Sequence, residues 1–288
     1  MRTIIIINPA AGRGKAAAVW QQLRQSCPEL VSACPVSFTE RPGHARELAA
    51  AAATRYETIV SIGGDGTVHE IVNGIAGKPV RLVIVPAGTG NDLARILAVP
   101  PQPAAALRLM RSGHPREIDL GRVDGVWFMN VSGVGFDAEV VSDVNSGCRF
   151  PGGSAYILSV LKTLFRYRPA AAEITVDGVT HFSRIYIASV ANGQYYGGGM
   201  RIAPQAALDD GMFDVCVVRD LGKIGFLRAF PTVFKGEHTN HPAVSFYRGR
   251  EVRITTAAPL TVQADGEVVG RTPVTFTLVP RSLTVLVP

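Results

Sequence analysis

Three glycine-rich segments, residues 8–15, 63–67 and 88–92, have the composition of phosphate-binding turns. Each one directly follows a short run of β-branched residues and leads into a stretch with helical character. Glycines let the backbone approach an anion closely, and the free N–H groups at the start of a following helix can bind it. These segments therefore point to phosphate recognition.

The first segment does not have the composition of a Walker A loop, because Ala16 stands where Ser or Thr would hold magnesium. Gly12, Gly14 and Ala17 do match the G-x-G-x-x-A pattern of dinucleotide-binding turns. Glu40 lies just beyond the next predicted strand, where such turns place an acidic residue. The match is weak by itself, and it leaves a dinucleotide-dependent oxidoreductase open as an alternative.

The second segment reads Gly-Gly-Asp-Gly-Thr and opens a predicted helix that includes Glu70. Its three glycines can expose a row of N–H donors, and Thr67 can add a hydroxyl. A carboxylate among phosphate-binding donors would repel the phosphate unless a cation lay between them. Asp65 therefore predicts a magnesium ion that bridges to phosphate. The third segment, which ends at Asn91 and Asp92, repeats this arrangement after its own strand.

The apolar pattern predicts the elements that must position these turns. Up to residue 123, strands and helices alternate, which is typical of a parallel sheet covered by helices. In such a sheet the carboxyl ends of the strands share one edge, where ligands bind. One glycine-rich segment is most often an ordinary tight turn, whereas three on one edge favour a common site. The predicted strands are 4–7, 36–39, 58–62 and 82–85, and the predicted helices are 16–25, 45–55, 68–75 and 93–97.

After residue 123 the pattern changes to strands without helices between most of them. Asp177-Gly178 and Asp265-Gly266 lie between apolar runs, which is the strongest local signal for a hairpin. Two helices are predicted near 154–167 and 223–235. The sequence thus predicts two domains, an α/β domain over 1–123 and a mainly antiparallel β domain over 124–288, with a ligand cleft between them. The predicted strands of the second domain are 172–176, 184–190, 213–218, 253–255, 260–264, 274–279 and 283–287.

The composition limits the compartment and the partners. The four cysteines show no CxxC spacing, which argues against a zinc site and an exported disulfide framework. No apolar run reaches the ~20 residues that a membrane span needs, and the N-terminal run is short for a signal peptide. The net charge of +6 favours an anionic partner, but no basic run with interleaved aromatic residues resembles a nucleic-acid platform. We therefore expect a cytoplasmic protein that does not bind nucleic acid.

Together the three segments resemble the catalytic domain of diacylglycerol and sphingosine kinases, and most closely the bacterial lipid kinases of that family. The Gly-Gly-Asp-Gly loop alone also occurs in NAD kinases and 6-phosphofructokinases. The resemblance extends over nearly the whole chain in the family's order. In the second half it rests on Asn130–Asp137, Ala191–Gly193, Gly197–Met200, Leu208–Gly211 and Gln263–Glu267.

This resemblance implies a Rossmann-like nucleotide lobe followed by a β-sandwich lipid lobe, with ATP and Mg²⁺ as cofactors. It implies catalytic roles for Asp65, near the magnesium, and for Glu267, as the general base that takes the proton of a lipid hydroxyl. By itself, Glu267 belongs to a hairpin tip, and Asp92 suits the N-cap of a short helix. The nucleotide-binding residues implied are Asn8, Gly12, Gly14, Lys15, Thr39, Glu40, Gly63, Gly64, Gly66, Thr67, Glu70, Gly88, Thr89, Asn91 and Asp92.

The resemblance also implies a structural magnesium bound by Asp209, Asp210 and Met212, organised with the help of Asp119. By composition alone the Asp209-Asp210 segment suits an ordinary turn. The implied partner is a lipid at the inner face of the membrane, with peripheral attachment and a possible homodimer. Basic and apolar residues that could touch the membrane are Arg149, Tyr156, Ile157, Leu158, Leu161, Lys162, Leu164, Phe165, Arg166, Arg168, Lys223, Arg228 and Lys235, although such apolar residues more often face a core.

The expected reaction is the phosphorylation of a lipid hydroxyl, most directly diacylglycerol to phosphatidic acid. The alternatives are a kinase for a sphingosine-like lipid or phosphatidylglycerol, an NAD kinase, and an inactive nucleotide-binding regulator. The second-half motifs disfavour an NAD kinase, and the presence of both Asp65 and Glu267 disfavours an inactive protein.

Overall fold

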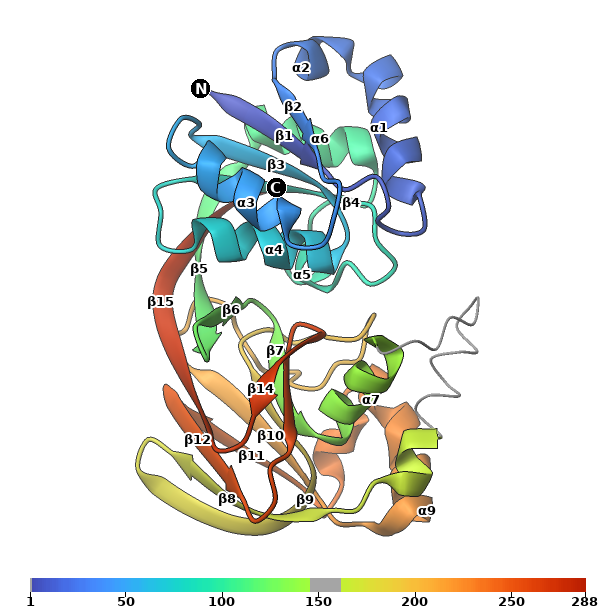
Figure 1. The fold of residues 1–288 in the computed structure, drawn as a ribbon, viewed down its shortest axis with the longest axis vertical. Coiled ribbons are helices and arrows are strands. Elements are labelled where there is room, and N and C mark those ends of the chain that lie inside the picture. Colours follow the sequence, from blue (N-terminus) through green and yellow to red (C-terminus); the bar gives the residue numbers. More distant parts are fainter. Residues whose placement is uncertain (1, 146–161) are drawn as a thin grey trace.

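The N-terminal part of the computed structural model is a parallel sheet flanked by helices (Figure 1). The structure describes residues 2–145 and 162–288. The sheet order is β2, β1, β3, β4, and all three pairings are parallel. Its strands are β1 (Thr3–Ile7), β2 (Val36–Phe38), β3 (Thr58–Gly63) and β4 (Arg81–Pro86). Its helices are α1 (Lys15–Ser26), α2 (Pro28–Ser32), α3 (His44–Ala52), α4 (Asp65–Ile75), α5 (Asp92–Ile96) and α6 (Pro103–Ser112).

Continuous apolar runs explain this parallel sheet. Helices cover both faces of such a sheet, so its strands read as unbroken β-branched sequence. Every residue of β1 and β3 is buried, and each of the two strands ends at one of the glycine-rich turns. The alternation of strand and helix therefore predicted the four parallel strands and four of the helices, whereas α2 and α6 were not predicted.

The C-terminal part is mainly antiparallel, as predicted, and the two-part α/β plus β-sandwich architecture is confirmed. Residues 162–166 are helical, and the rest of the predicted helix near 154–167 falls largely outside the described residues. Helix α9 (Gly222–Ala229) continues into the 3-10 turns η1 (Phe230–Lys235) and η2 (Glu237–Asn240). The remaining elements are β5 (His114–Val123), β6 (Val126–Phe128), β7 (Val131–Gly135), α7 (Phe136–Asn145), β8 (Ala170–Val176), β9 (Val179–Ala191), β10 (Phe213–Arg219), β11 (Val244–Gly249), β12 (Glu251–Thr256), β13 (Thr261–Ala264), β14 (Glu267–Arg271) and β15 (Val274–Val287).

Asp-Gly pairs form the tight hairpins of this part. Asp177-Gly178 joins β8 to β9 and Asp265-Gly266 joins β13 to β14, and both predictions are confirmed. Asp124-Gly125 joins β5 to β6 in the same way. All of these residues have positive φ, the geometry that type I′ turns require.

The last strand crosses from one part of the molecule to the other. The sequence predicts two strands over 274–279 and 283–287, but β15 is one strand of 14 residues whose register shifts between Val279 and Leu283. The shift follows from Pro280, which has no N–H, and from Arg281, which has positive φ. The first half pairs with β12, whereas Thr284 and Val285 pair with β4. The chain therefore ends in the N-terminal core, and the predicted boundary at residue 123 stays a prediction.

Three clusters of buried side chains form the core. One lies around the parallel sheet, one inside the sandwich, and one between the outer sheet face and helices α7 and α9. Within residues 2–145 and 162–288, none of the helices combines the length and the apolar character that crossing a bilayer requires.

Candidate active site

A cleft of about 550 Å³ lies where the glycine-rich turns of the N-terminal part face the β13–β14 hairpin. Gly14, Lys15, Gly63, Asn91 and Asp92 belong to the same turns but do not line it. The cleft thus brings together residues that the sequence separates widely. The predicted residues that line it are Asn8, Gly12, Thr39, Glu40, Gly64, Asp65, Gly66, Thr67, Glu70, Gly88, Thr89 and Glu267.

Close backbone contact between the turns explains two of the glycines. A Cβ on Gly64 would lie 3.0 Å from the Cα of Gly88, and a Cβ on Gly88 would lie 2.6 Å from the Cα of Gly64. The second and third turns therefore touch through their main chains, and only glycine fits at both positions. Gly63 has a packing role too, because a Cβ there would lie 2.5 Å from the side chain of Thr67.

A side-chain hydrogen bond joins the first and second turns. The amide nitrogen of Asn8 donates to the Thr67 hydroxyl oxygen at 3.0 Å. The Thr67 hydroxyl accepts this bond, so its proton is available to donate to an anion in the cleft. The Asn8 amide oxygen accepts the N–H of Ala10 at 3.2 Å, which holds the first turn in place.

The carboxylate of Asp65 links the second turn to the third. One of its oxygens accepts the Asn91 N–H at 2.6 Å, and the other accepts the Asp92 N–H at 2.7 Å. Burial raises the pKa of Asp65 to about 6, and the neighbouring Asp92 carboxylate adds to the rise, which the two hydrogen bonds partly offset. A half-buried carboxylate with a raised pKa is electrostatically unfavourable when ionised, and a cation in the cleft would relieve it.

Asp92 reaches across to the C-terminal part. Its side chain is buried and accepts the N–H of Gly198 at 2.8 Å and a hydrogen bond from the guanidinium of Arg95. The N-cap position of α5 belongs to Asn91, which has a φ of 53°, and Asp92 is the first helical residue. Asp92 therefore does not serve as the N-cap, because its carboxylate is engaged by Gly198 and Arg95.

Glu70 lines the cleft, but its carboxylate is already engaged. Its two oxygens accept the N–H groups of Gly43 at 2.8 Å and Ala45 at 3.0 Å, at the start of α3. The first N–H groups of a helix lack partners within the helix, so this contact stabilises α3. The contact also fixes the chain that carries Thr39 and Glu40 at the edge of the cleft.

Glu267 is the first residue of β14, and its exposed side chain enters the cleft from the C-terminal part. The tip of its hairpin is anchored by Asp265, whose side chain is only 1% exposed. The Asp265 carboxylate accepts the N–H groups of residues 129–131 at 2.7, 3.0 and 3.2 Å. The Asp265 anchor therefore fixes the strand on which Glu267 lies.

His69 completes this anchor from the N-terminal part. Its Nδ1 lies 3.3 Å from an oxygen of Asp265, and its Nε2 lies 3.3 Å from the side-chain nitrogen of Asn73. The two contacts fit the tautomer in which Nδ1–H donates to Asp265 and Nε2 accepts from Asn73. Sequence reasoning missed His69, although its position four residues after Asp65 in α4 places both on one side of the helix.

Replacing His69 with Ala should lower the free energy of unfolding by about 1.5–3 kcal/mol, because a buried carboxylate loses a donor. His69→Asn should recover much of this loss, since its amide N–H can take the place of Nδ1–H. Urea unfolding followed by circular dichroism measures both. His114→Ala, at an exposed position at the start of β5, is the control and should change the value by less than about 0.5 kcal/mol. An unchanged midpoint for His69→Ala would show that the contact does not stabilise the fold.

Asp119 is buried beside the loop that contains Asp209 and Asp210. Its oxygens accept the N–H groups of Gly211 and Arg281, both at 2.8 Å. It thus ties the 208–211 loop to β15. This arrangement is compatible with the predicted supporting role, which stays a prediction.

Asp209 and Asp210 have separate arginine partners. Asp209 accepts from Arg116 at 2.9 and 3.0 Å, and Asp210 is ion-paired with Arg248 and accepts the N–H of Met212 at 3.1 Å. Within the described parts of the chain, no three His, Cys, Asp or Glu residues are grouped as metal ligands. A magnesium ion at this loop would compete with two arginines, and the predicted metal site stays a prediction.

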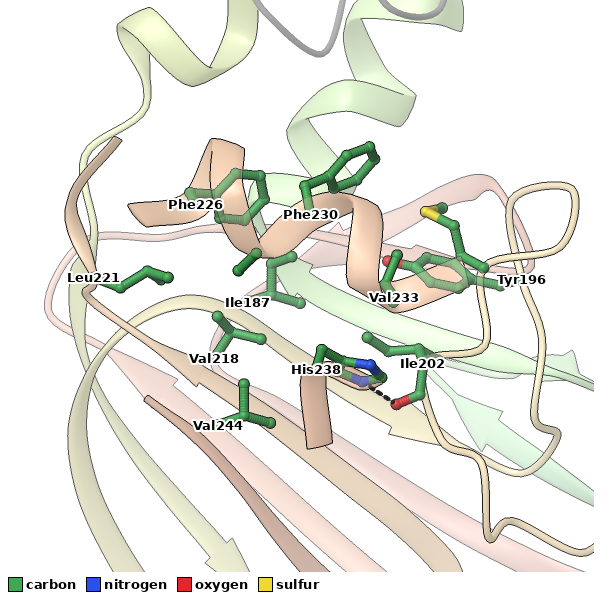
Figure 2. Close-up of a pocket in the computed structure, with 12 residues that line it drawn as sticks. Ile187, Tyr196, Ile202, Val218, Leu221, Phe226, Phe230, Val233, His238 and Val244 are labelled. Carbon is green, nitrogen blue, oxygen red and sulfur yellow. Dashed lines mark hydrogen bonds between the residues drawn. The ribbon is translucent and has the colours of Figure 1, made fainter. Parts of the chain in front are cut away.

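A second, apolar cavity of about 50 Å³ lies in the C-terminal part (Figure 2). Strand residues such as Ile187 and Val218 line one side, and Phe226, Phe230 and Val233 line the other. His238 lies at its base, where its Nε2 lies 3.0 Å from the carbonyl oxygen of Ile202. Burial lowers the pKa of His238, which favours a neutral ring in this apolar surrounding.

The predicted membrane-contact residues divide between surface and core. Leu164 is fully buried, so the core alternative holds for it, whereas Phe165 is 66% exposed. Arg149, Tyr156, Ile157, Leu158 and Leu161 lie outside the described residues. The remaining basic candidates, Lys162, Arg166, Arg168, Lys223, Arg228 and Lys235, are all exposed.

Comparison with known proteins shows which family this chain resembles. Two family models match, a diacylglycerol kinase catalytic domain over residues 2–123 and a YegS C-terminal NAD kinase beta sandwich-like domain over 130–287. A diacylglycerol kinase of Bacillus subtilis (strain 168) is 32% identical over 292 residues, covering 100% of this chain and 96% of that protein. A diacylglycerol kinase of Mycobacterium tuberculosis is 36% identical over 249 residues, covering 84% of this chain and 80% of that protein.

Solved structures agree on the fold. A diacylglycerol kinase structure from Bacillus anthracis, 24% identical, superposes with a TM-score of 0.79 and covers 100% of this chain and 97% of that chain. Another structure from the same organism, 26% identical, superposes with a TM-score of 0.82 at the same coverage. The family models and the relatives together confirm the resemblance that the motifs predicted. The chain therefore belongs to the diacylglycerol kinase family of ATP-dependent lipid kinases.

Proposed function

We propose that this chain transfers the γ-phosphoryl group of ATP to the hydroxyl of diacylglycerol and forms phosphatidic acid. The observation that carries the proposal is the position of Glu267, which enters the same cleft as the glycine-rich turns but from the other part of the molecule. In this proposal the N-terminal part supplies the phosphate-binding surface of the cleft, and the C-terminal part supplies the proton acceptor.

In the proposed step, the acceptor oxygen forms a bond to the γ-phosphorus while the bond from that phosphorus to the ADP oxygen breaks. Glu267 takes the proton of the hydroxyl, and ADP leaves. The N–H groups of the glycine-rich turns and the Thr67 hydroxyl bind and orient the phosphates. Because phosphoryl transfer depends mainly on positioning and charge, these contacts carry much of the expected rate.

We propose Asp65 as the residue that holds Mg²⁺. Magnesium in kinases is usually bound by one or two carboxylates together with phosphates and water, so a dense protein cluster is not expected. The raised pKa of Asp65 and its place in the wall of the cleft fit such a ligand. When bound, the ion would neutralise negative charge on the phosphates.

The apolar cavity of Figure 2 has walls of aliphatic and aromatic side chains, which suit an apolar group better than a nicotinamide or ribose. At about 50 Å³ it is far smaller than the roughly 300 Å³ or more of an ordinary ligand pocket, so it has no room here for a whole acyl chain. Tyr196 and Met200 line it and flank the Gly197–Gly199 turn, and that turn contacts Asp92. The cavity therefore lies next to a turn that contacts the third glycine-rich turn through Asp92.

A transfer assay with radiolabelled ATP tests the proposed function. Diacylglycerol, sphingosine, phosphatidylglycerol and NAD are offered separately to the purified protein. We expect label on diacylglycerol at a rate at least about tenfold above the others. Preferential labelling of another lipid would change the substrate, and labelling of NAD would indicate an NAD kinase. ATP binding without any labelled product would indicate an inactive regulator.

We also propose peripheral attachment to an anionic membrane. With a net charge of +6, the protein should bind anionic vesicles and leave them as salt is added, since screening lengths fall to about 8–10 Å at ordinary ionic strength. Sedimentation with phosphatidylglycerol vesicles across a salt series measures this, with phosphatidylcholine vesicles as the control. Equal binding to both vesicles, or binding that salt does not change, would contradict it.

A further inference from the structure

Helix α9 has apolar side chains on two sides. Phe226 is buried and, with Phe230 just beyond the helix, lines the cavity of Figure 2. On the other side Ile224 is 69% exposed and Leu227 is 40% exposed. A helix on a protein surface normally keeps one apolar side against the core and one polar side in water. Grouped exposed apolar side chains are typical of an interaction surface.

The helical segment 162–166 adds to this surface. Phe165 is 66% exposed, and Lys223 at the start of α9 donates a hydrogen bond to its carbonyl oxygen. The Lys223 ammonium also lies 5.7 Å from the centre of the Phe165 ring. Figure 1 shows both segments side by side at the end of the C-terminal part. We refer to Phe165, Lys223, Ile224, Leu227 and Arg228 as the α9 face.

Positive charge predominates around the α9 face, where the acidic Asp220 just before α9 is paired with Arg184 at 3.9 Å. Lys223 and Arg228 are exposed within it. Lys162, Arg166 and Lys235 are exposed on the adjoining segments, and Asp143 pairs with Lys162 at 3.7 Å. Exposed apolar side chains flanked by lysine and arginine are what a helix at an anionic lipid surface requires.

We propose that the α9 face docks on an anionic bilayer. The proposal rests on the lipid-kinase function and gives it a membrane-binding surface. Phe165, Ile224 and Leu227 enter the boundary between headgroups and acyl chains, and Lys223 and Arg228 contact lipid phosphates. Docking in this orientation also places the apolar cavity directly behind the helix that touches the bilayer, because Phe226 and Phe230 form its wall.

The positive charge of the α9 face favours an anionic bilayer over a second copy of this chain as its partner. A two-fold dimer interface places the same patch on both subunits. The basic residues of two α9 faces would then lie close to each other, which costs free energy. A bilayer that contains acidic lipids has the opposite charge and no such repulsion.

The double variant Ile224→Glu/Leu227→Glu tests the proposal. Glutamate is a good helix former, so α9 should remain folded, and circular dichroism and the thermal midpoint check this. Binding is measured by sedimentation with vesicles of phosphatidylcholine containing about 30% phosphatidylglycerol. We expect the vesicle affinity to fall at least about tenfold, because two apolar side chains are lost and two negative charges are added.

Phe182→Glu is the matched control. Phe182 is 78% exposed on β9 and lies outside the α9 face, so the change removes one exposed apolar side chain and adds one negative charge elsewhere, as each substitution of the double variant does within the face. We expect its vesicle affinity to change less than about twofold. An equal loss for Phe182→Glu would overturn the proposal, as would wild-type affinity in the folded double variant.

Two further measurements separate the possible failures. With a short-chain diacylglycerol dissolved as monomers, the double variant should turn over like the wild type, since the catalytic cleft is unchanged. If the wild type phosphorylates no lipid but still binds vesicles through this face, only the proposed function fails. If sedimentation velocity shows a wild-type dimer that the double variant dissociates, while vesicle binding persists, the α9 face is a subunit interface and the proposal is wrong.

Discussion

Asp65→Asn should reduce turnover by about 10³-fold or more while the protein stays folded. The side chain keeps its size, but it loses the negative charge that we propose to hold the metal. The charge lies among the glycine-rich turns that we propose to bind phosphate, where a bound cation would offset the repulsion between carboxylate and phosphate. Steady-state turnover with ATP and diacylglycerol, together with circular dichroism, measures the effect. Near-native activity in a folded Asp65→Asn protein would contradict the proposed site.

Hydrogen bonding at Asp65 makes a structural control necessary. An asparagine can accept only through its one oxygen, so one of the Asn91 and Asp92 N–H groups would lose its partner. Asp177→Asn is a suitable match, because Asp177 also accepts main-chain N–H groups, those of Arg250 and Glu251. Asp177 lies in the β8–β9 turn, outside the cleft, so its variant should lose stability without losing turnover.

The pH dependence gives a second test of Asp65. Its pKa of about 6 in the folded protein lies above its ordinary value of 3.8. The ionised form therefore dominates only above about pH 6, and the affinity for magnesium and ATP should fall as the pH drops through that value. The free energy of unfolding should depend on pH in the opposite direction. Because the pKa of Asp65 is raised in the folded state, its protonation stabilises the fold at low pH, and this contribution disappears as the pH rises through about 6. Isothermal titration with Mg·ATP across this range should show the dependence in the wild type and lose it in Asp65→Asn.

Glu267→Gln should lower turnover by about 10²–10⁴-fold and leave ATP affinity nearly unchanged. The change keeps the size and hydrogen bonding of the side chain but removes the proton acceptor, and the loss corresponds to roughly 3–5 kcal/mol of barrier. ATP affinity should persist because the glycine-rich turns that we propose to bind ATP belong to the N-terminal part. Turnover and ATP affinity are measured on the same folded variant.

Glu251→Gln is the control for Glu267→Gln. Glu251 is likewise an exposed glutamate at the first position of a strand, but it lies in β12 outside the cleft. A plain turn role for Glu267 predicts a loss of only a few tenths of a kcal/mol in stability for both variants. A loss of turnover below about threefold would show that Glu267 is not the base. The base would then have to be sought among Asp65, Asp92 and Asp119, of which Asp65 lines the cleft.

The sequence by itself determined the local structure of the site. Glycine-rich segments directly after β-branched runs predicted the tight turns, and Asp-Gly pairs fit the positive φ angles of tight hairpins. Continuous β-branched runs alternating with helices predicted the parallel sheet, and its topology places the turns on one edge. These features depend on residues that are close together in the chain, so residue type and spacing predict them.

Only the tertiary structure decided how those residues are used. The contact between His69 and Asp265 joins residues 196 positions apart, and no local pattern encodes such a pairing. The Glu70 carboxylate binds the start of α3, and Asp65 accepts N–H groups of the third turn, and the sequence alone indicated neither contact. A carboxylate binds whichever donors the packed elements bring within reach, so its partners follow from how the helices and the two parts of the molecule fit together. The apolar side chains of α9 obey the same principle, because burial of Phe226 and exposure of Ile224 depend on which side of the helix the sheet occupies.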